Sequence, residues 1–201
     1  MKIYGLFLIA ATSLVLASCG GADSAAEELV VAPEMATLSV DKESSVLMWK
    51  GMKNAEYFHT GEIRFSKGQV MFVDGNLAGG GFTVDMSTIL TTDPNLPENK
   101  QLVLTKHLSS ADFFNIEKNQ TAQIKLGSLD GGLVPTTLVF MGQSLTQNLP
   151  LEIIYTDEGA SINGEFDFDF TKLMVPGFQP QEGQSESIQP VISFQLDMKL
   201  K

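Results

Sequence analysis

The residues able to do acid–base or metal chemistry are few and lie far apart. The chain of 201 residues has two histidines, His59 and His107, and one cysteine, Cys19. Neither histidine stands in a convincing triad or metal-ligand set, and so few His and Cys residues argue against a His/Cys metal site. For His107 we expect a structural role, donating to a backbone carbonyl at the start of a short helix. The sequence therefore predicts no catalytic residue, no metal ligand and no cofactor.

The most regular acidic residues are Glu165, Asp167 and Asp169, which alternate with phenylalanines. In a strand such residues share one face, which we expect to be the solvated outer face. A two-carboxylate glycosidase needs acids that converge from separate elements, and the sequence selects no such pair. The run 79–81 is three glycines without a following Lys-Ser/Thr, so it is not a phosphate loop, and a strand bend or bulge is expected instead. These patterns do not predict an enzyme.

Composition excludes several further classes. The formal net charge is −11, with 13 Lys and Arg against 24 Asp and Glu. This balance argues against nucleic acid as a partner, because phosphates require a basic surface. Hydrophobic residues make up 43%, which is too many for a disordered chain, and one cysteine excludes an internal disulfide framework.

The first residues predict an export signal. Met1-Lys2 is followed by an apolar run over 4–16, the pattern of a secretory signal and too short for a membrane span. The segment ends Leu16-Ala17-Ser18-Cys19-Gly20, which resembles the lipobox of bacterial lipoproteins. The resemblance implies cleavage before Cys19 and acylation of that cysteine, hence attachment to a membrane of the cell envelope, on the periplasmic side or at the outer membrane. The alternative is an ordinary signal peptide with an incidental cysteine.

Three segments follow from this pattern. Residues 1–18 are predicted to be the signal peptide. Residues 19–36, small and acidic, are predicted to be a lipidated cysteine and a flexible tether. Residues 37–201 are predicted to form the folded domain.

The domain has the two-residue period of β-strands. In 165–170, three phenylalanines fall on one face and three acids on the other, and the same alternation runs through 192–200. The predicted strands are 45–51, 60–66, 69–74, 80–87, 121–129, 133–141, 149–156, 165–170 and 192–200.

Glycine-containing turns separate these strands. The predicted hairpin turns are at 67–68, 74–75, 130–132 and 157–159. Asn163-Gly164 either extends the last of these loops or forms a bulge. Two connections are longer: 91–120, where a serine at 109 or 110 is expected to cap a short helix, and the irregular 171–190. Such strands and hairpins predict an all-β barrel or sandwich.

The order of several motifs resembles the YceI-like family of polyisoprenoid-binding proteins over roughly 38–200. The motifs are Val46-Leu47-Met48-Trp49-Lys50-Gly51, His59-Thr60-Gly61-Glu62-Ile63-Arg64-Phe65, His107-Leu108-Ser109-Ser110-Ala111-Asp112-Phe113-Phe114-Asn115, Ala122-Gln123-Ile124-Lys125-Leu126 and Leu138-Val139-Phe140-Met141-Gly142. The resemblance implies a lipocalin-like antiparallel barrel of eight main strands with one short helix in a long connection. It also implies an elongated apolar cavity that holds a long isoprenoid chain, such as a quinone tail.

The inward apolar residues are the candidate ligand-binding residues. An eight-stranded barrel is just wide enough to be filled by its own side chains or to hold one ligand, so each residue either fills the core or lines a cavity. Phe113 and Phe114 are expected to cap one end of the barrel. The candidates are Trp49, Phe65, Phe72, Phe82, Val84, Phe113, Phe114, Ile124, Leu126, Phe166, Phe168, Phe194 and Leu196.

The sequence thus predicts a lipid-anchored protein that stores, carries or protects a long-chain isoprenoid lipid at the cell envelope. One alternative is an interaction or stress protein with a filled barrel, and another is an envelope hydrolase. The oligomeric state is left open, with a dimer among the possibilities.

Overall fold

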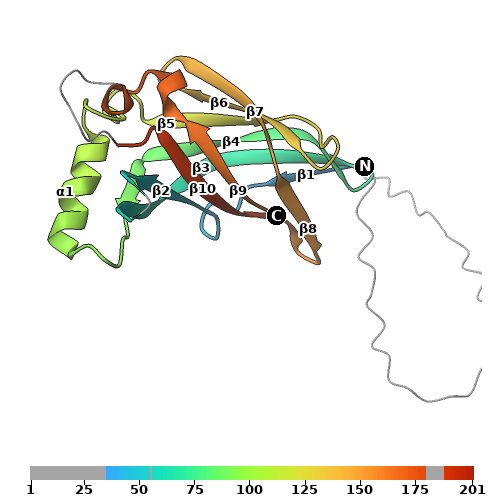
Figure 1. The fold of residues 1–201 in the computed structure, drawn as a ribbon. Coiled ribbons are helices and arrows are strands. Elements are labelled where there is room, and N and C mark those ends of the chain that lie inside the picture. The colour runs from blue at the N-terminus through green and yellow to red at the C-terminus, as the bar shows by residue number, and fades with distance from the viewer. Residues whose placement is uncertain (1–34, 55, 180–187) are drawn as a thin grey trace, which may run out of the picture.

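The protein forms one curled antiparallel sheet with a helix at one end (Figure 1). The computed structural model describes residues 35–54, 56–179 and 188–201. The predicted signal peptide, Cys19 and most of the predicted tether lie outside these residues. Within them the strands are β1 (Met35–Ser39), β2 (Val46–Met52), β3 (Phe58–Val73), β4 (Asn76–Thr91), β5 (Thr121–Leu126), β6 (Val134–Phe140), β7 (Gln143–Leu149), β8 (Leu151–Thr156), β9 (Gly159–Asp169) and β10 (Val191–Leu200), and the helices are α1 (Glu98–Ser109) and the short 3₁₀ helices η1 (Phe170–Leu173) and η2 (Pro176–Phe178).

The strand order confirms the predicted all-β, barrel-like architecture. The sheet runs β7-β6-β5-β4-β3-β2-β10-β9-β8, and β1 pairs with β3. The described residues form ten strands rather than eight main ones. One reason is that β1 and β2 pair with different parts of the same strand, β3, near its end and its start. Another is that the chain breaks at Pro150 into two strands, β7 and β8, that stand at opposite ends of the order.

The two ends of the sheet meet through side chains. The side-chain amide of Gln147 on β7 donates to the Asp167 carbonyl on β9 at 2.7 Å, and that of Gln143 donates to the Leu173 carbonyl at 3.2 Å. The pairing of β8 with β9 stops at Gly164, where a Cβ would lie 2.7 Å from the Leu151 side chain. Asn163-Gly164 therefore lies inside β9, paired in register with β10, and forms neither a loop nor a bulge.

Glycines explain one correct and one wrong turn prediction. Asp74-Gly75 joins β3 to β4 as expected. The turn predicted at Lys67-Gly68 is wrong, because β3 runs through it as one strand with a register shift between Phe65 and Lys67. Gly68 is required for close packing instead, since a Cβ there would lie 2.6 Å from Val40 and from Phe82.

The triple glycine 79–81 lies at a register shift of β4 against β3, which confirms the predicted strand irregularity. Gly79 and Gly80 have φ values of 146° and 149°, a region that disfavours side chains.

The helix in the long connection is confirmed, but its predicted start is wrong. We expected a serine at 109 or 110 to begin it, whereas α1 ends at Ser109. The Ser110 hydroxyl donates to the His107 carbonyl at 2.7 Å and so satisfies an acceptor at the C-terminal end of the helix. Pro97 precedes its first residue and occupies the N-cap position.

The barrel is packed solid at the end away from α1, which we call the closed end. Tyr155 packs edge-on against Phe72 there and donates its hydroxyl to the Gly75 carbonyl at 2.8 Å. Its fully buried side chains are Val70, Phe72, Leu77, Val134, Ile162 and Met198.

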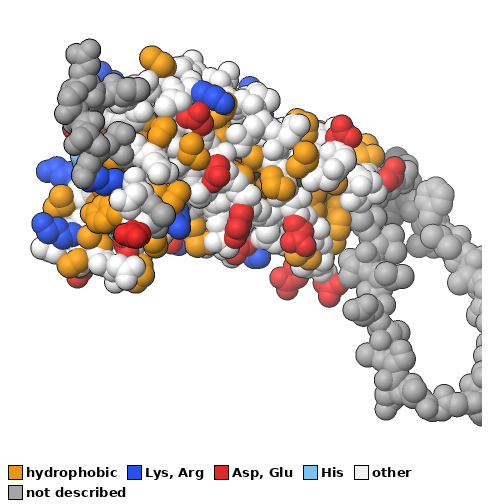
Figure 2. Space-filling view, in the orientation of Figure 1, with side chains coloured by type: hydrophobic (Ala, Val, Ile, Leu, Met, Phe, Trp, Pro, Cys, Tyr) orange, Lys and Arg blue, Asp and Glu red, His pale blue; other side chains and the backbone are white. Residues whose placement is uncertain are grey.

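The outer face carries the acidic residues. Glu165 and Asp167 are exposed, as their alternation with phenylalanines predicted. On the face shown in Figure 2, acidic side chains are spread along the barrel, whereas Lys and Arg gather around the α1 end.

Candidate functional site

An apolar cavity occupies the half of the barrel nearest α1. Its volume is about 260 Å³, close to the lower end of the range for ligand pockets, ~300 Å³. Every strand from β2 to β10 contributes to the lining, and Leu104 and Leu108 of α1 cover one end. The cavity stops where the packed side chains of the closed end begin.

The strand period explains why this wall is apolar. Phe166 on β9 is paired with Phe194 on β10, and their rings stack 5.9 Å apart. Phe168 packs edge-on against both, at 5.5 and 6.0 Å. Because neighbouring side chains on a strand point to opposite faces, the intervening acids face outward.

Eleven of the thirteen candidate residues predicted from sequence line this cavity. They are Trp49, Phe82, Val84, Phe113, Phe114, Ile124, Leu126, Phe166, Phe168, Phe194 and Leu196.

The other two candidates, Phe65 and Phe72, are buried outside the lining. Phe65 packs edge-on against Phe82 at 5.2 Å, and it is Phe82 that reaches the cavity. Phe72 belongs to the closed end, because it lies at the far end of β3. Their alternation marked the inward face correctly, but it carried no information on how far along the barrel the cavity extends.

Phe113 and Phe114 lie at the α1 end and are buried. The Phe114 ring contacts Phe140 and Phe170, each at 5.9 Å. Phe113 contacts Phe178 at 5.3 Å, in space left by a glycine, since a Cβ on Gly177 would overlap its ring. Sequence reasoning did not select Phe140, Phe170 or Phe178 as cavity residues. Phe140 and Phe170 lie within predicted strands, whereas Phe178 lies in a segment with no strand alternation.

The opening of the cavity is marked by lining residues that are also exposed. Tyr57 is 54% exposed and Ile188 is 39% exposed, and both lie beside the start of β3. Lys53 and His59 also line this part, which we call the mouth. Tyr57 packs edge-on against His59 at 5.1 Å. The mouth is therefore aromatic and polar, unlike the wall behind it.

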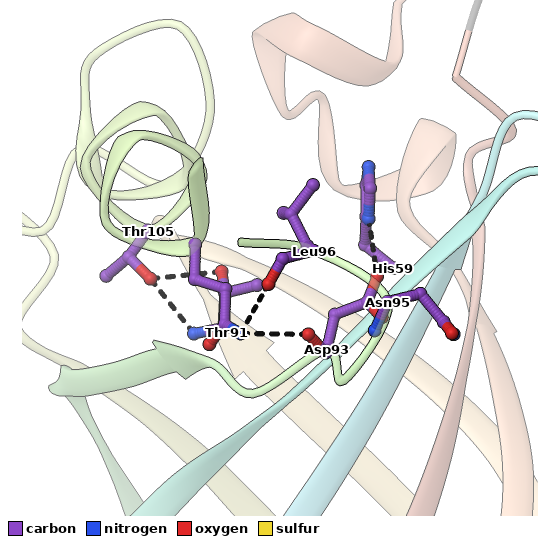
Figure 3. A network of polar contacts seen from close by, with 7 residues as sticks. His59, Thr91, Asp93, Asn95, Leu96 and Thr105 are labelled. Carbon is purple, nitrogen blue, oxygen red and sulfur yellow. Dashed lines mark hydrogen bonds and ion pairs between the residues drawn. The ribbon is translucent and has the colours of Figure 1, made fainter. Parts of the chain in front are cut away.

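A buried carboxylate holds His59 in place (Figure 3). Nδ1 of His59 lies 2.7 Å from Oδ2 of Asp93, whose side chain is 3% exposed. The hydrogen bond from His59 lowers the pKa of Asp93 below its ordinary value, against the opposing effect of burial. The backbone N–H of Asn95 donates to the other carboxylate oxygen at 2.8 Å and acts in the same direction. Asp93 is therefore ionised at neutral pH.

The same network fixes the loop between β4 and α1. The Gln101 side chain donates to the carbonyls of Asp93 and Leu96, both at 2.8 Å. Thr105 on α1 accepts from the Thr91 backbone N–H at 2.9 Å (Figure 3). Helix α1 contributes no fully buried residue, so these bonds complement its apolar contacts in holding it over the cavity.

The pairing of His59 with Asp93 escaped sequence reasoning. The two residues are 34 positions apart, and no motif joins them. His107 lies in the last turn of α1, so the prediction that it stands at the helix start is wrong. It is 3.7 Å from the exposed Asp112 carboxylate and edge-on to Phe113.

The polar atoms of Thr136 and Trp49 in the cavity wall are bonded to backbone or buried. The Thr136 hydroxyl donates to the Val134 carbonyl at 3.0 Å. Trp49 Nε1 is buried and has no hydrogen-bond partner within the described parts of the chain. The wall can therefore hold an apolar chain but offers it no polar contact.

The described parts of the chain show neither a metal site nor a membrane-spanning helix. No cluster of His, Cys, Asp and Glu suited to a metal ion occurs among these residues. None of the helices described for this chain is long and apolar enough to cross a membrane.

Comparison with known proteins points to one family. A family model for the YceI-like domain matches residues 38–200. The fold is similar to Burkholderia cenocepacia BcnA, with a TM-score of 0.64 and 15% identity over 81% of this chain and 99% of that chain. It is also similar to a polyisoprenoid binding domain from Saccharophagus degradans implicated in plant cell wall breakdown, with a TM-score of 0.60 and 12% identity over 82% and 97%. No curated protein matched the sequence.

Proposed function

The chain belongs to the YceI-like family, and on that premise we propose that it binds a long-chain polyisoprenoid or similar amphipathic lipid, for example an isoprenoid quinone. Binding would serve storage, transport or protection of the lipid at the cell envelope. The solved relative described as a polyisoprenoid binding domain supports this choice of ligand.

The observation that carries the proposal is the apolar cavity within the barrel. An isoprenoid tail has no hydrogen-bonding groups, so it needs only apolar surface, and the wall provides little else. Burying several hundred Å² of tail at ~25 cal/mol per Å² would contribute on the order of 10 kcal/mol before ordering costs. No charged contact is needed for capture.

The volume of the cavity limits how much of the ligand's isoprenoid chain it can enclose. A cavity of roughly 150 Å³ holds a benzene ring, so about 260 Å³ encloses only the end of a long polyisoprenoid chain. The remaining units would lie toward the mouth, against α1 and the exposed Tyr57 and Ile188. Affinity should therefore rise with chain length over the first few isoprene units and then level off.

Export and anchoring belong to the same proposal. The lipobox-like ending at Cys19 supports acylation of that cysteine. Stable attachment takes two or more acyl chains, and a lipoprotein cysteine would carry them on its sulfur and its amine. The barrel would then be held beside the membrane in which its ligand is dissolved.

An enzymatic function has less support. The His59–Asp93 pair resembles the base and the orienting acid of a hydrolase triad. Among the described residues, however, no Ser, Thr or Cys side chain is hydrogen-bonded to Nε2 of His59, so the nucleophile of a triad is missing there. A binding role fits the residues present.

Native mass spectrometry of gently purified protein tests the proposal. We expect a co-purified long-chain lipid, or uptake of added geranylgeraniol and of an isoprenoid quinone at one molecule per chain. A clean protein mass with no uptake of either compound would refute it and favour an interaction protein without ligand.

A further inference from the structure

The polar groups that border the cavity are confined to its mouth. The wall behind it is apolar, its Thr136 hydroxyl is bonded to backbone, and Trp49 Nε1 is buried. At the mouth, Tyr57 and His59 bring a phenol and an imidazole to the edge of the cavity. This division orients an amphipathic ligand whose chain fits within the cavity, with its tail inside and its polar end beside His59.

His59 has one nitrogen committed and one available. An ionised carboxylate only accepts hydrogen bonds, so Nδ1–H of His59 donates to Asp93. Nε2 lies on the opposite side of the ring, and Figure 3 shows it turned away from Asp93. His59 lines the cavity, whereas Asp93 does not. Among the described residues, Nε2 has no hydrogen-bond partner.

We propose that Nε2 of His59 binds a terminal hydroxyl of the ligand, an alcohol or a phenol, at the mouth of the cavity. Asp93 acts as a positioning residue, because it fixes the ring and its tautomer. The inference rests on the proposed function and names the head group that the site selects.

A hydroxyl suits this nitrogen in both protonation states of His59. With a neutral ring, Nε2 carries a lone pair and accepts from the hydroxyl. With a protonated ring, Nε2–H donates to the hydroxyl oxygen. A carbonyl or an ether oxygen satisfies only the protonated form, and a hydrocarbon end satisfies neither. The Tyr57 ring, packed edge-on at 5.1 Å, limits access of competing water to one side of the imidazole.

The test compares ligands that share a tail and differ at the end. The probes are geraniol, its methyl ether and the corresponding 10-carbon hydrocarbon, with a geranyl phenol and its methyl ether as a second pair. About 260 Å³ can hold a chain of this length with its polar end at the mouth. For the unaltered protein we expect the hydroxyl compound of each pair to bind on the order of fivefold more tightly than the ether, the worth of one neutral hydrogen bond. If only one pair shows tighter binding of the hydroxyl compound, that pair identifies the head group as an alcohol or as a phenol.

Variants test whether the preference for the hydroxyl compound depends on His59 and Asp93. His59→Phe keeps a ring against Tyr57 and removes both nitrogens, so the ratio of ether to hydroxyl dissociation constants should fall to about one. The double variant His59→Phe/Asp93→Asn does the same without leaving a buried carboxylate unpaired. Binding of the hydrocarbon reports that each variant is folded. His107→Ala removes the other histidine, which lies outside the cavity lining, and serves as the matched control.

The outcomes separate the two proposals. Equal binding of hydroxyl and ether by the unaltered protein overturns this inference and leaves the proposed function standing. A preference that survives in both His59 variants, or that disappears equally in His107→Ala, also overturns it. If no probe binds at all, the proposed function fails as well.

Discussion

Two alanines, one in the cavity wall and one in the packed core, offer a direct test of the cavity. Ala122 on β5 lines the cavity beside Val84, and Ala160 on β9 is buried at the closed end beside Leu200. Both are in strands paired on each side, and both are less than a tenth exposed. Phenylalanine at either position adds the same ring to a different environment.

At Ala122 the ring has room. A volume of about 260 Å³ exceeds the roughly 150 Å³ that accommodates benzene. We therefore expect Ala122→Phe to change the free energy of unfolding by less than about 1 kcal/mol, because apolar burial offsets the lost rotamer freedom. At Ala160 no cavity is available, and overpacking should cost about 1–3 kcal/mol. For a domain of this size that lowers Tm by about 2–12 °C.

The same substitution should block binding only at Ala122. A ring in the cavity displaces several carbons of a bound tail. Losing three of them costs about 2.4 kcal/mol at ~0.8 kcal/mol per carbon, or about fiftyfold in Kd. Ala160→Phe should bind geranylgeraniol within about threefold of the unaltered protein, after correction for the unfolded fraction.

Thermal unfolding by circular dichroism and geranylgeraniol binding by fluorescence competition check these values on the same preparations. The reasoning is refuted if Ala122→Phe loses as much Tm as Ala160→Phe, because the volume would then not be accessible to a ring. It is also refuted if Ala122→Phe remains folded and binds the lipid unchanged.

Three further predictions follow from individual contacts. Phe114→Ala should weaken lipid retention about tenfold or more while lowering stability by less than the ~3–5 kcal/mol of a fully packed core phenylalanine, measured as lipid off-rate and Tm; an equal loss of both would indicate a purely structural ring. Gly61→Ala should lower stability by several kcal/mol in denaturant unfolding, because its Cβ would overlap the Leu90 carbonyl and the indole of Trp49; an unchanged midpoint would contradict this. The lowered pKa of Asp93 means that its carboxylate stabilises the fold above its ordinary pKa of about 3.8, and this contribution is lost as the pH falls from there through the folded value. Asp93→Asn should therefore show a shallower fall of Tm below about pH 4 than the unaltered protein, and parallel curves would argue against the ion pair.

The inward-facing aromatic residues were predictable because side chains along a strand point alternately to its two faces. Phe166, Phe168 and Phe194 alternate with acids, and one face of a barrel strand must be apolar. The same rule placed Phe72 on the inward face but could not say that its end of the barrel is filled. That depends on side chains from β6, β9 and β10, which meet only after folding.

Other features were missed because their causes are not local. Gly68 looked like a turn residue, yet it is required by the approach of Val40 and Phe82 from other strands. Strand β7 (Gln143–Leu149) is polar and stands at one end of the sheet order, so its alternation is weak. The link between His59 and Asp93 joins the start of β3 to the loop after β4, and no spacing rule connects these positions.

The position of β1 has a consequence for how the barrel would be oriented. Met35 pairs with Val73 at one end of β3, while His59 lies near the other end, 14 residues away along the strand, or about 45 Å. If the protein is held through the residues that precede Met35, its attachment point and its opening are at opposite poles. With the barrel axis perpendicular to the membrane, the opening would face away from the membrane. The bound lipid could then pass to an acceptor on that side. Loading from the anchoring membrane would require the barrel to turn its opening toward that surface on the predicted flexible tether, residues 19–36, so two orientations would separate delivery from uptake.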